Sequence, residues 1–104
     1  MHAYGGTSDR LLTLKLAVEM LKPQLLISGN PVADSLAVGF DRSGKGSVLD
    51  ILHTGGTWGS TAIVWAYPET GQGAVIMTNS ATVSRFRFEI LLGIALEYGW
   101  PMIQ

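Results

Sequence analysis

HTGGTWGSTAIVWAYPETGQGAVIMTNS, residues 53–80, contains two long apolar runs, and these runs predict the centre of the fold. The runs 60–68 and 73–79 have the length and the β-branched and aromatic content of strands, and a turn rich in glycine and proline joins them. Because a parallel pair would need a long crossover, so short a connection predicts antiparallel pairing. The glycines after His53 indicate that the backbone comes close to a ligand or to a neighbouring strand.

Two more strands are predicted upstream of this stretch, over residues 36–41 and 48–53. Downstream of it, a final helix is predicted from a cap at Asn79 or Ser80 to about Tyr98, where a glycine and a proline follow. Arg85 and Arg87 alternate with Phe86 and Phe88, which is unusual for a helix and gives a start later than Val83 as the alternative.

A further helix is predicted near the N-terminus, from about Arg10 to Leu21. Ser8 or Asp9 can cap it, and Pro23 stops it. Its predicted apolar face consists of Leu11, Leu14, Val18 and Leu21.

Neither face of the predicted sheet alternates with charge, so both faces are expected to be buried. Two helices could cover one face, and the second face then has no cover within the 104 residues. The predicted fold is therefore α+β: an antiparallel sheet of three to four strands flanked by an N-terminal and a C-terminal helix, in a single partial domain over residues 1–104. In the run 60–68, the two faces carry Ile63, Trp65 and Tyr67, and Ala62, Val64 and Ala66.

The chain carries little charge for its size. Charged residues make up 14% of the sequence, whereas typical soluble domains carry about 25%. A small domain has much surface for its volume and should need more charge, not less. We therefore expect part of the surface to be covered, either by another copy in a homo-oligomer or by a missing part of the same protein.

Several classes of function are not supported by the sequence. The longest apolar stretch, Ile90–Leu96, is about seven residues long, whereas a membrane-spanning helix needs about 20. The net charge is −1 and the basic residues do not cluster, so no nucleic-acid partner is expected. The absence of cysteine excludes disulfides and thiolate chemistry. No signal peptide is visible, and the compartment is left open.

His53 is the first candidate for chemistry. No second histidine or suitably spaced carboxylate lies near it, so no metal site and no cofactor is predicted. Asp50 is three residues away and would point to the opposite face of a regular strand, so the two are not expected to pair. Ser60 lacks the GxSxG surroundings of an exposed nucleophile. From the residues alone, the simplest interpretation of His53 is a histidine at a strand end near solvent.

Several segments together resemble a known superfamily. Three motifs carry the resemblance: HTGG at a strand end, the hairpin AYPETGQGAVIMTNS and the helix EILLGIALEYGWP. Together they are similar to the C-terminal third of the penicillin-recognising serine hydrolases. The branch that they resemble contains class C β-lactamases, D-alanyl-D-alanine peptidases and related esterases. The similarity covers roughly residues 14–101 and includes LAVEMLKPQ and LAVGF, which stands where the family has a yGlGf strand. The hairpin Tyr67–Asn79 and the EYGWP ending are its most specific parts.

The resemblance implies a role for the HTGG motif. The family uses a Ser-x-x-Lys nucleophile, a second motif centred on tyrosine and a Lys-Thr-Gly box, in which many relatives carry histidine instead of lysine. His53, Thr54 and Gly55 occupy this third box, and His53 would place a positive or hydrogen-bonding group near an acyl substrate. The backbone N–H of Gly56 would be one of two oxyanion donors. A side chain at the glycines would block an extended substrate, and relatives often act outside the cytoplasm.

The chain lacks the motifs that carry the family's catalytic residues. No serine has a lysine three residues later, and Ser84, followed by Arg87, comes nearest. No YxN motif is present, since AYGG at residues 3–6 does not match it. The family's first two strands, which pair beside the last strand, and its helical region are also missing. Acyl transfer by the monomer is therefore not expected, and whether the chain acts as an enzyme is left open.

Three hypotheses follow. The first is a C-terminal fragment of a serine hydrolase, which carries the third active-site box and needs an N-terminal partner. The second is a stand-alone, non-enzymatic module that self-associates through its uncovered sheet. The third is a complete enzyme built on Ser60 and His53. In any of them, Trp58 could line a substrate pocket, or it could cover the glycines and pack on a neighbour.

Overall fold

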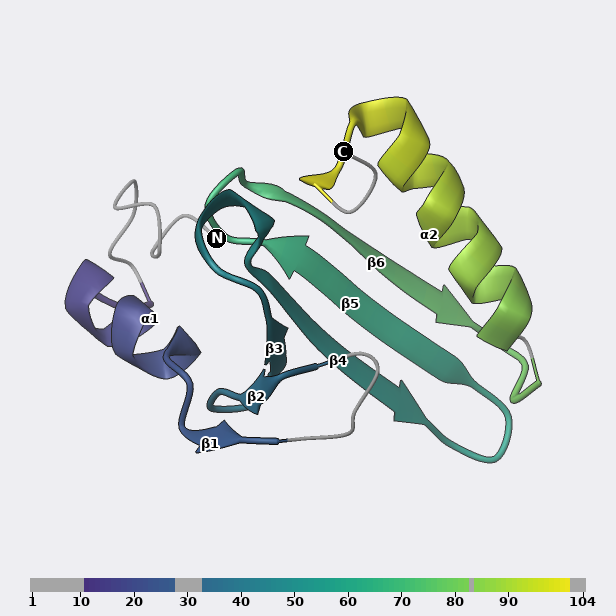
Figure 1. Cartoon of the computed structure of the whole chain (residues 1–104). Helices are drawn as coiled ribbons and strands as arrows, with labels where there is room; N and C mark the ends of the chain where they lie inside the picture. The colour runs from purple at the N-terminus through teal and green to yellow at the C-terminus, as the bar shows by residue number, and fades with distance from the viewer. Residues whose placement is uncertain (1–10, 28–32, 83, 102–104) are drawn as a thin grey trace.

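The computed structural model describes residues 11–27, 33–82 and 84–101. Its centre is an antiparallel sheet in which consecutive strands are neighbours, from β1 to β6 (Figure 1). Together with two helices, this sheet makes the fold α+β, as predicted. The elements are α1 (Leu14–Leu21), β1 (Leu25–Leu26), β2 (Ser35–Leu36), β3 (Asp41–Ser43), a 3-10 turn (Gly46–Val48), β4 (Asp50–Gly56), β5 (Thr61–Tyr67), β6 (Gln72–Thr78) and α2 (Ser84–Tyr98).

The sheet has six strands, so the prediction of three to four strands was wrong. β5 and β6 lie where the apolar runs predicted them, whereas β4 runs from Asp50 to Gly56 and not over residues 48–53, so the prediction that His53 ends this strand was wrong. The run 36–41, predicted as one strand, instead contributes to β2 and β3, because the chain reverses at Gly39, whose φ of +82° favours glycine. β1 consists only of Leu25 and Leu26, which pair with β2. A strand of two residues is too short to leave a periodic pattern in the sequence.

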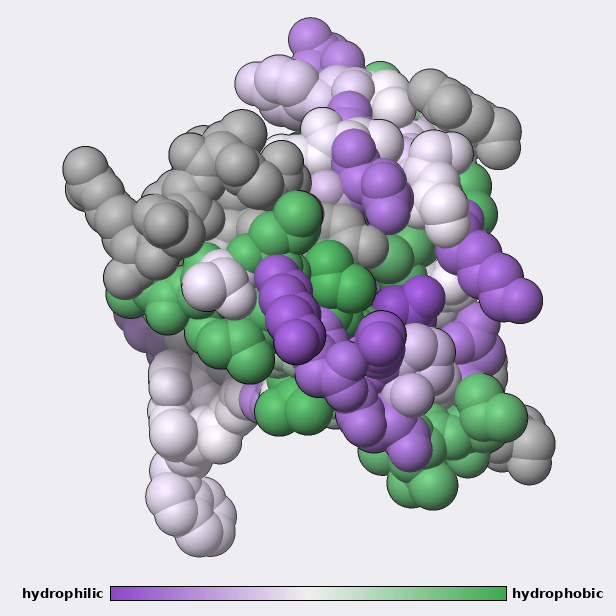
Figure 2. All heavy atoms as spheres, turned by 90° about the vertical axis from the view of Figure 1, so that its left-hand side faces the viewer, coloured by the Kyte–Doolittle hydropathy of each residue, from purple (hydrophilic) through white to green (hydrophobic). Residues whose placement is uncertain are grey.

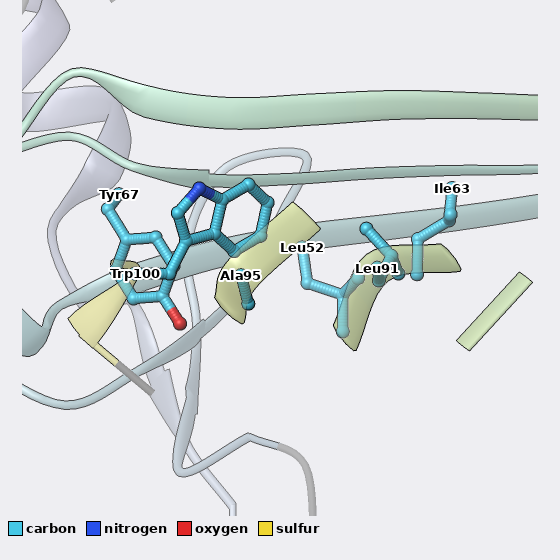
Figure 3. Packing of buried hydrophobic residues seen from close by; sticks show 6 residues of the cluster. All are labelled: Leu52, Ile63, Tyr67, Leu91, Ala95 and Trp100. Carbon is cyan, nitrogen blue, oxygen red and sulfur yellow. The ribbon is translucent and has the colours of Figure 1, made fainter. Parts of the chain in front are cut away.

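The main core lies between the long strands and α2. Side chains alternate along a strand, so one face of β4 to β6 points toward α2 throughout. Near the C-terminal end of α2, the rings of Tyr67 and Trp100 meet edge-to-face, with centroids 5.5 Å apart and an interplanar angle of 69°. The buried cluster on this side consists of Leu52, Ile63, Tyr67, Leu91, Ala95 and Trp100 (Figure 3).

Trp100 reaches the core because α2 ends in a defined turn. Gly99 follows the helix with a φ of +63°, and the N–H of Trp100 donates to the carbonyl of Ala95 at 2.9 Å. This is the Schellman pattern, in which a left-handed glycine turns the chain back along the helix. The predicted end of the helix at about Tyr98 is confirmed.

The cap of α2 was predicted too early, whereas the alternative of a start later than Val83 is confirmed. The helix begins at Ser84, and not directly after a cap at Asn79 or Ser80. The Ser80 hydroxyl instead accepts the N–H of Thr82 at 3.3 Å, which forms a local turn before the helix.

α1 also begins later than predicted, at Leu14 and not at Arg10. The hydroxyl of Thr13 accepts the N–H of Leu16 at 3.2 Å and caps the helix. The caps predicted from the sequence are Ser8 and Asp9, and both of these residues lie outside the described part of the chain.

The two helices lie on opposite faces of the sheet, and not together on one face as predicted (Figure 1). The reason is the alternation along β4 and β5, which presents Ile51 and Ala66 to the face away from α2, where Leu21 of α1 packs on them. The predicted apolar face of α1 is confirmed at Leu21 and wrong at its other residues, since Leu14 is 51% exposed and Val18 36%. Leu11 precedes the helix and is 94% exposed, and the helix buries Ala17 and Leu21.

Candidate functional site

The HTGG motif lies at an open edge of the sheet. β3 pairs with β4 only along Asp50–Leu52, whereas β5 pairs with the other side of β4 as far as Gly56. Within the described residues, the segment His53–Gly56 therefore has a neighbouring strand on one side alone. All four of its residues are exposed. An edge of this kind can pair with another extended chain.

The register determines which backbone groups face the open edge. Thr57 donates its N–H to the carbonyl of Ser60 at 2.9 Å, so Thr57 points toward β5. Backbone groups alternate in direction along a strand, so the odd-numbered residues of β4 also point toward β5. Thr54 and Gly56 therefore direct their N–H and C=O groups to the open edge.

Gly55 and Gly56 leave space beside this edge. A Cβ atom on Gly55 would meet no atom within 4 Å, and one on Gly56 would meet Ser60 and Thr61 at 3.6 and 3.8 Å, which is ordinary contact. Neither glycine has a positive φ. The sheet itself does not require glycine at these positions, which favours the close approach of a group from outside the described residues.

His53 lies on the face of the sheet that α2 does not cover, opposite Val64 of β5. A shallow hollow of about 230 Å³ is found here, and His53, Gly55 and Val64 are among its lining residues. Val75 and Met77 of β6 lie on the same face and are 65% and 77% exposed. α1 covers the other end of this face. We call the uncovered part the open face; it consists of His53, Gly55, Ala62, Val64, Val75 and Met77.

Apolar side chains also reach the surface on the side of α1 and the short strands. Figure 2 shows them there in separate groups, with hydrophilic side chains between them. Leu14 and Leu16 of α1 are each about half exposed, at 51% and 55%. The chain therefore combines a low content of charged residues with exposed apolar side chains on more than one side of the molecule.

Trp58 lies in the loop between β4 and β5 and is fully exposed, at 102%. A hydrogen bond of 2.7 Å between the hydroxyls of Thr57 and Ser60 closes this loop. An indole so exposed does not cover the glycines. It remains available to line a pocket that a binding partner completes.

Ser60 and His53 do not come together. Ser60 is at the loop end of the hairpin, whereas His53 lies opposite Val64, four residues further along β5. At 3.3 Å per residue this separation is about 13 Å. The third hypothesis, a complete site on these two side chains, is therefore not supported by the geometry.

The prediction that Asp50 and His53 point to opposite faces of the strand is confirmed, but the partial burial of Asp50 was missed. Asp50 lies on the α2 side of β4, away from His53, and its carboxylate accepts the indole N–H of Trp65 at 3.2 Å. Burial raises the pKa of Asp50 to about 6; the hydrogen bond from Trp65 lowers it, and the nearby Asp34 raises it. The signal in the sequence was an aspartate inside the apolar run VLDILH.

Asp50→Asn is expected to stabilise the chain above pH 6 and to have little effect near pH 4. The pKa of Asp50 is higher in the folded chain than its ordinary value of 3.8, so stability falls as the pH rises from about 3.8 to about 6, the range in which the unfolded chain has lost this proton and the folded chain still holds it. A pKa difference of about 2 corresponds to about 3 kcal/mol, and solvent screening around the partly buried Asp50 makes this an upper limit for the gain.

Urea unfolding of the wild type and of Asp50→Asn at about pH 4 and pH 8 measures this gain. Glu97→Gln, on the exposed side of α2, removes the same charge and is the matched control. The same pH dependence in Asp50→Asn and in the wild type would show that Asp50 is not the group responsible.

Comparison with known protein families, with curated proteins and with solved structures finds no match for this chain. In the described part of the chain, neither helix is long and apolar enough to cross a membrane. Over the same residues, no group of three or more histidine, cysteine, aspartate or glutamate residues is placed to hold a metal ion.

Proposed function

We propose that this chain forms one wall of an acyl-transfer site of the serine-hydrolase type, and that another polypeptide segment supplies the nucleophile. The observation that carries the proposal is the open edge of β4 at His53–Gly56, with free space beside Gly55. An acyl compound such as a lactam, a peptide or an ester would lie extended along this edge and pair with its backbone.

Each residue of the motif has a role in this proposal. The Gly56 N–H, directed to the open edge, donates to the oxyanion that forms when the acyl group is attacked. The imidazole of His53 supplies a hydrogen bond or a positive charge beside the substrate. The absence of side chains at Gly55 and Gly56 lets the substrate approach the strand.

The open face offers a place for the segment that carries the nucleophile. Its apolar side chains border the hollow beside His53, and Val75 and Met77 are largely exposed. A segment that buries these side chains would gain hydrophobic stabilisation and would end up next to the HTGG strand. The low charge of the chain agrees with such a cover.

Two experiments test the proposal. A fluorophosphonate probe should not label the isolated chain, and labelling of Ser60 would show that the chain has its own nucleophile. In an NMR titration with a short N-acylated peptide, the backbone amides of His53–Thr57 should shift, with a Kd of about 1 mM or weaker. No shift of these amides up to about 10 mM, or shifts centred elsewhere, would contradict the proposal.

Gly56→Trp is expected to fold normally and to lose this binding. A side chain at residue 56 meets only ordinary contacts, so the free energy of unfolding should change by less than about 1 kcal/mol. The indole would project from the face of the sheet beside this edge and would hinder a peptide that pairs there. Thermal unfolding and the same NMR titration measure both effects. An insoluble variant would mean that Gly56 faces packed protein and that the edge is not a substrate groove.

A second candidate function is a stand-alone module that self-associates through the sheet. The observation that favours it is β6, an edge strand without charge or proline, beside the exposed Val75 and Met77. This function predicts an oligomer, together with no effect of the acylated peptide on the amides of His53–Gly56.

A further inference from the structure

The outer edge of β6 carries none of the usual protection against pairing. β6 is the last strand of the sheet in the described part of the chain, and it pairs with β5 over its whole length, Gln72–Thr78. Its sequence, QGAVIMT, contains no charge and no proline. Natural proteins usually block an exposed edge with charges, prolines or bulges, so a regular and uncharged edge of this length indicates a pairing partner.

The register determines which backbone groups of β6 face outward. The backbone N–H and C=O groups of the odd-numbered residues of β4 bond with those of the even-numbered residues of β5. Because backbone groups alternate in direction along a strand, the odd-numbered residues of β5 direct theirs toward β6. These residues lie opposite the even-numbered residues of β6 and bond with them. Gly73, Val75 and Met77 therefore direct their N–H and C=O groups away from the sheet.

We infer that this edge pairs with β6 of a second copy of the chain, antiparallel, around a two-fold axis at Val75. The inference deepens the second proposed function and rests on it. With Val75 opposite its own symmetry mate, the outward residues of both copies face one another and exchange both of their backbone hydrogen bonds. The interface uses the same surface on both copies, so it closes at a dimer.

The side chains that this register brings together are complementary. On the open face, Gly73 lies opposite Met77, so a residue without a side chain faces a large one. On the α2 face, Ala74 lies opposite Ile76, which repeats the small-to-large match. No two like charges meet, because the strand has none. The side chains of a second β6 thus match this edge at the Gly73–Met77 and Ala74–Ile76 positions.

A groove beside β6 gives the second copy a further contact. It has a volume of about 550 Å³, and Ala74 of β6 lines it together with Ile94, Tyr98 and Trp100 from α2 and the residues that follow it. In the proposed register, Ile76 of the second copy lies opposite Ala74 and extends over this groove. The small side chain of Ala74 leaves space for it.

Cross-linking tests the register directly, because the chain has no natural cysteine. In Val75→Cys, the two Cα atoms at the axis would be about 5.5 Å apart, within reach of a disulfide. Mild oxidation should therefore give a covalent dimer in high yield. Val64→Cys is the control on the same face: three strand spacings separate its two copies, about 14 Å, so it should not cross-link.

A charge at the axis should break the dimer. Val75→Lys places two like charges opposite each other and is expected to raise the dimer Kd at least tenfold in sedimentation velocity. Val38→Lys, at another exposed valine, adds the same charge away from β6 and should leave the Kd unchanged. Circular dichroism checks that both variants fold.

The outcomes separate this inference from the function on which it rests. Cross-linking of Val75→Cys together with weakening by Val75→Lys supports the β6 dimer. A dimer that Val75→Lys leaves intact, or that cross-links through Val64→Cys and not through Val75→Cys, overturns the β6 register but leaves self-association in place. A chain that stays monomeric at millimolar concentration overturns both.

Discussion

Trp100→Ala is expected to lower the free energy of unfolding by about 3–5 kcal/mol. Trp100 is 1% exposed and packs edge-on against Tyr67, so its removal leaves a large cavity between α2 and β5. A domain of this size has a total stability of about 5–15 kcal/mol, so the variant could lose a large part of it. Urea unfolding followed by circular dichroism measures the change.

Trp58→Ala is the matched control for this variant. It removes the same side chain from a position that is 102% exposed, and the free energy of unfolding should stay within about 0.5 kcal/mol of the wild type. A loss below about 1 kcal/mol for Trp100→Ala, or equal losses in both variants, would mean that the Tyr67–Trp100 contact does not anchor α2.

Gly73→Val is expected to destabilise the chain by about 1–3 kcal/mol. A Cβ atom on Gly73 would lie 3.0 Å from Cβ of Ala66 and 3.1 Å from the carbonyl oxygen of Trp65, so the strand β6 would have to shift. Gly55→Val is the comparison on the same face, because a Cβ atom there meets nothing within 4 Å. Its melting temperature should be unchanged or slightly raised.

Thermal unfolding of both valine variants in dilute solution measures this difference. Equal destabilisation by the two substitutions would show that the space beside Gly55 is occupied, and the substrate groove would lose its main support. A tolerated Gly73→Val would show that β5 and β6 have more freedom to separate than the register implies.

The long elements could be predicted from the sequence because each of them leaves several independent signals. β5 and β6 combine apolar runs with a glycine-rich turn, and the end of α2 is marked by Gly99 and Pro101. The short strands β1 to β3 leave no such pattern, since two or three residues do not make a period. The apolar face of α1 was predicted correctly only at Leu21, because leucines occur on more than one side of this helix.

The site could be predicted in its position but not in its environment. HTGG marks the end of a strand in the sequence, and the structure has β4 ending there. The open edge exists because β3 ends its pairing at Leu52, and no pattern in β3 shows where a pairing stops. The burial of Asp50 also depends on its cross-sheet neighbour Trp65, which sequence spacing does not reveal.

The proposed functions agree on one claim, that another polypeptide covers part of this chain. The open face, the edge of β6 and the low charge all support it. They differ in the partner, which is a segment with a nucleophile in the first proposal and a second copy in the second. The fluorophosphonate, titration and cross-linking experiments separate the two.

The most direct test of this shared claim is the molar mass of the purified chain in solution, measured by light scattering over a range of concentrations. We expect a mass that rises with concentration, toward twice the 11.1 kDa of one chain for a β6 dimer, or beyond it if the open face associates without a fixed partner. A stable mass of 11.1 kDa at every concentration, in a well-behaved sample, would contradict the claim that this surface needs a cover.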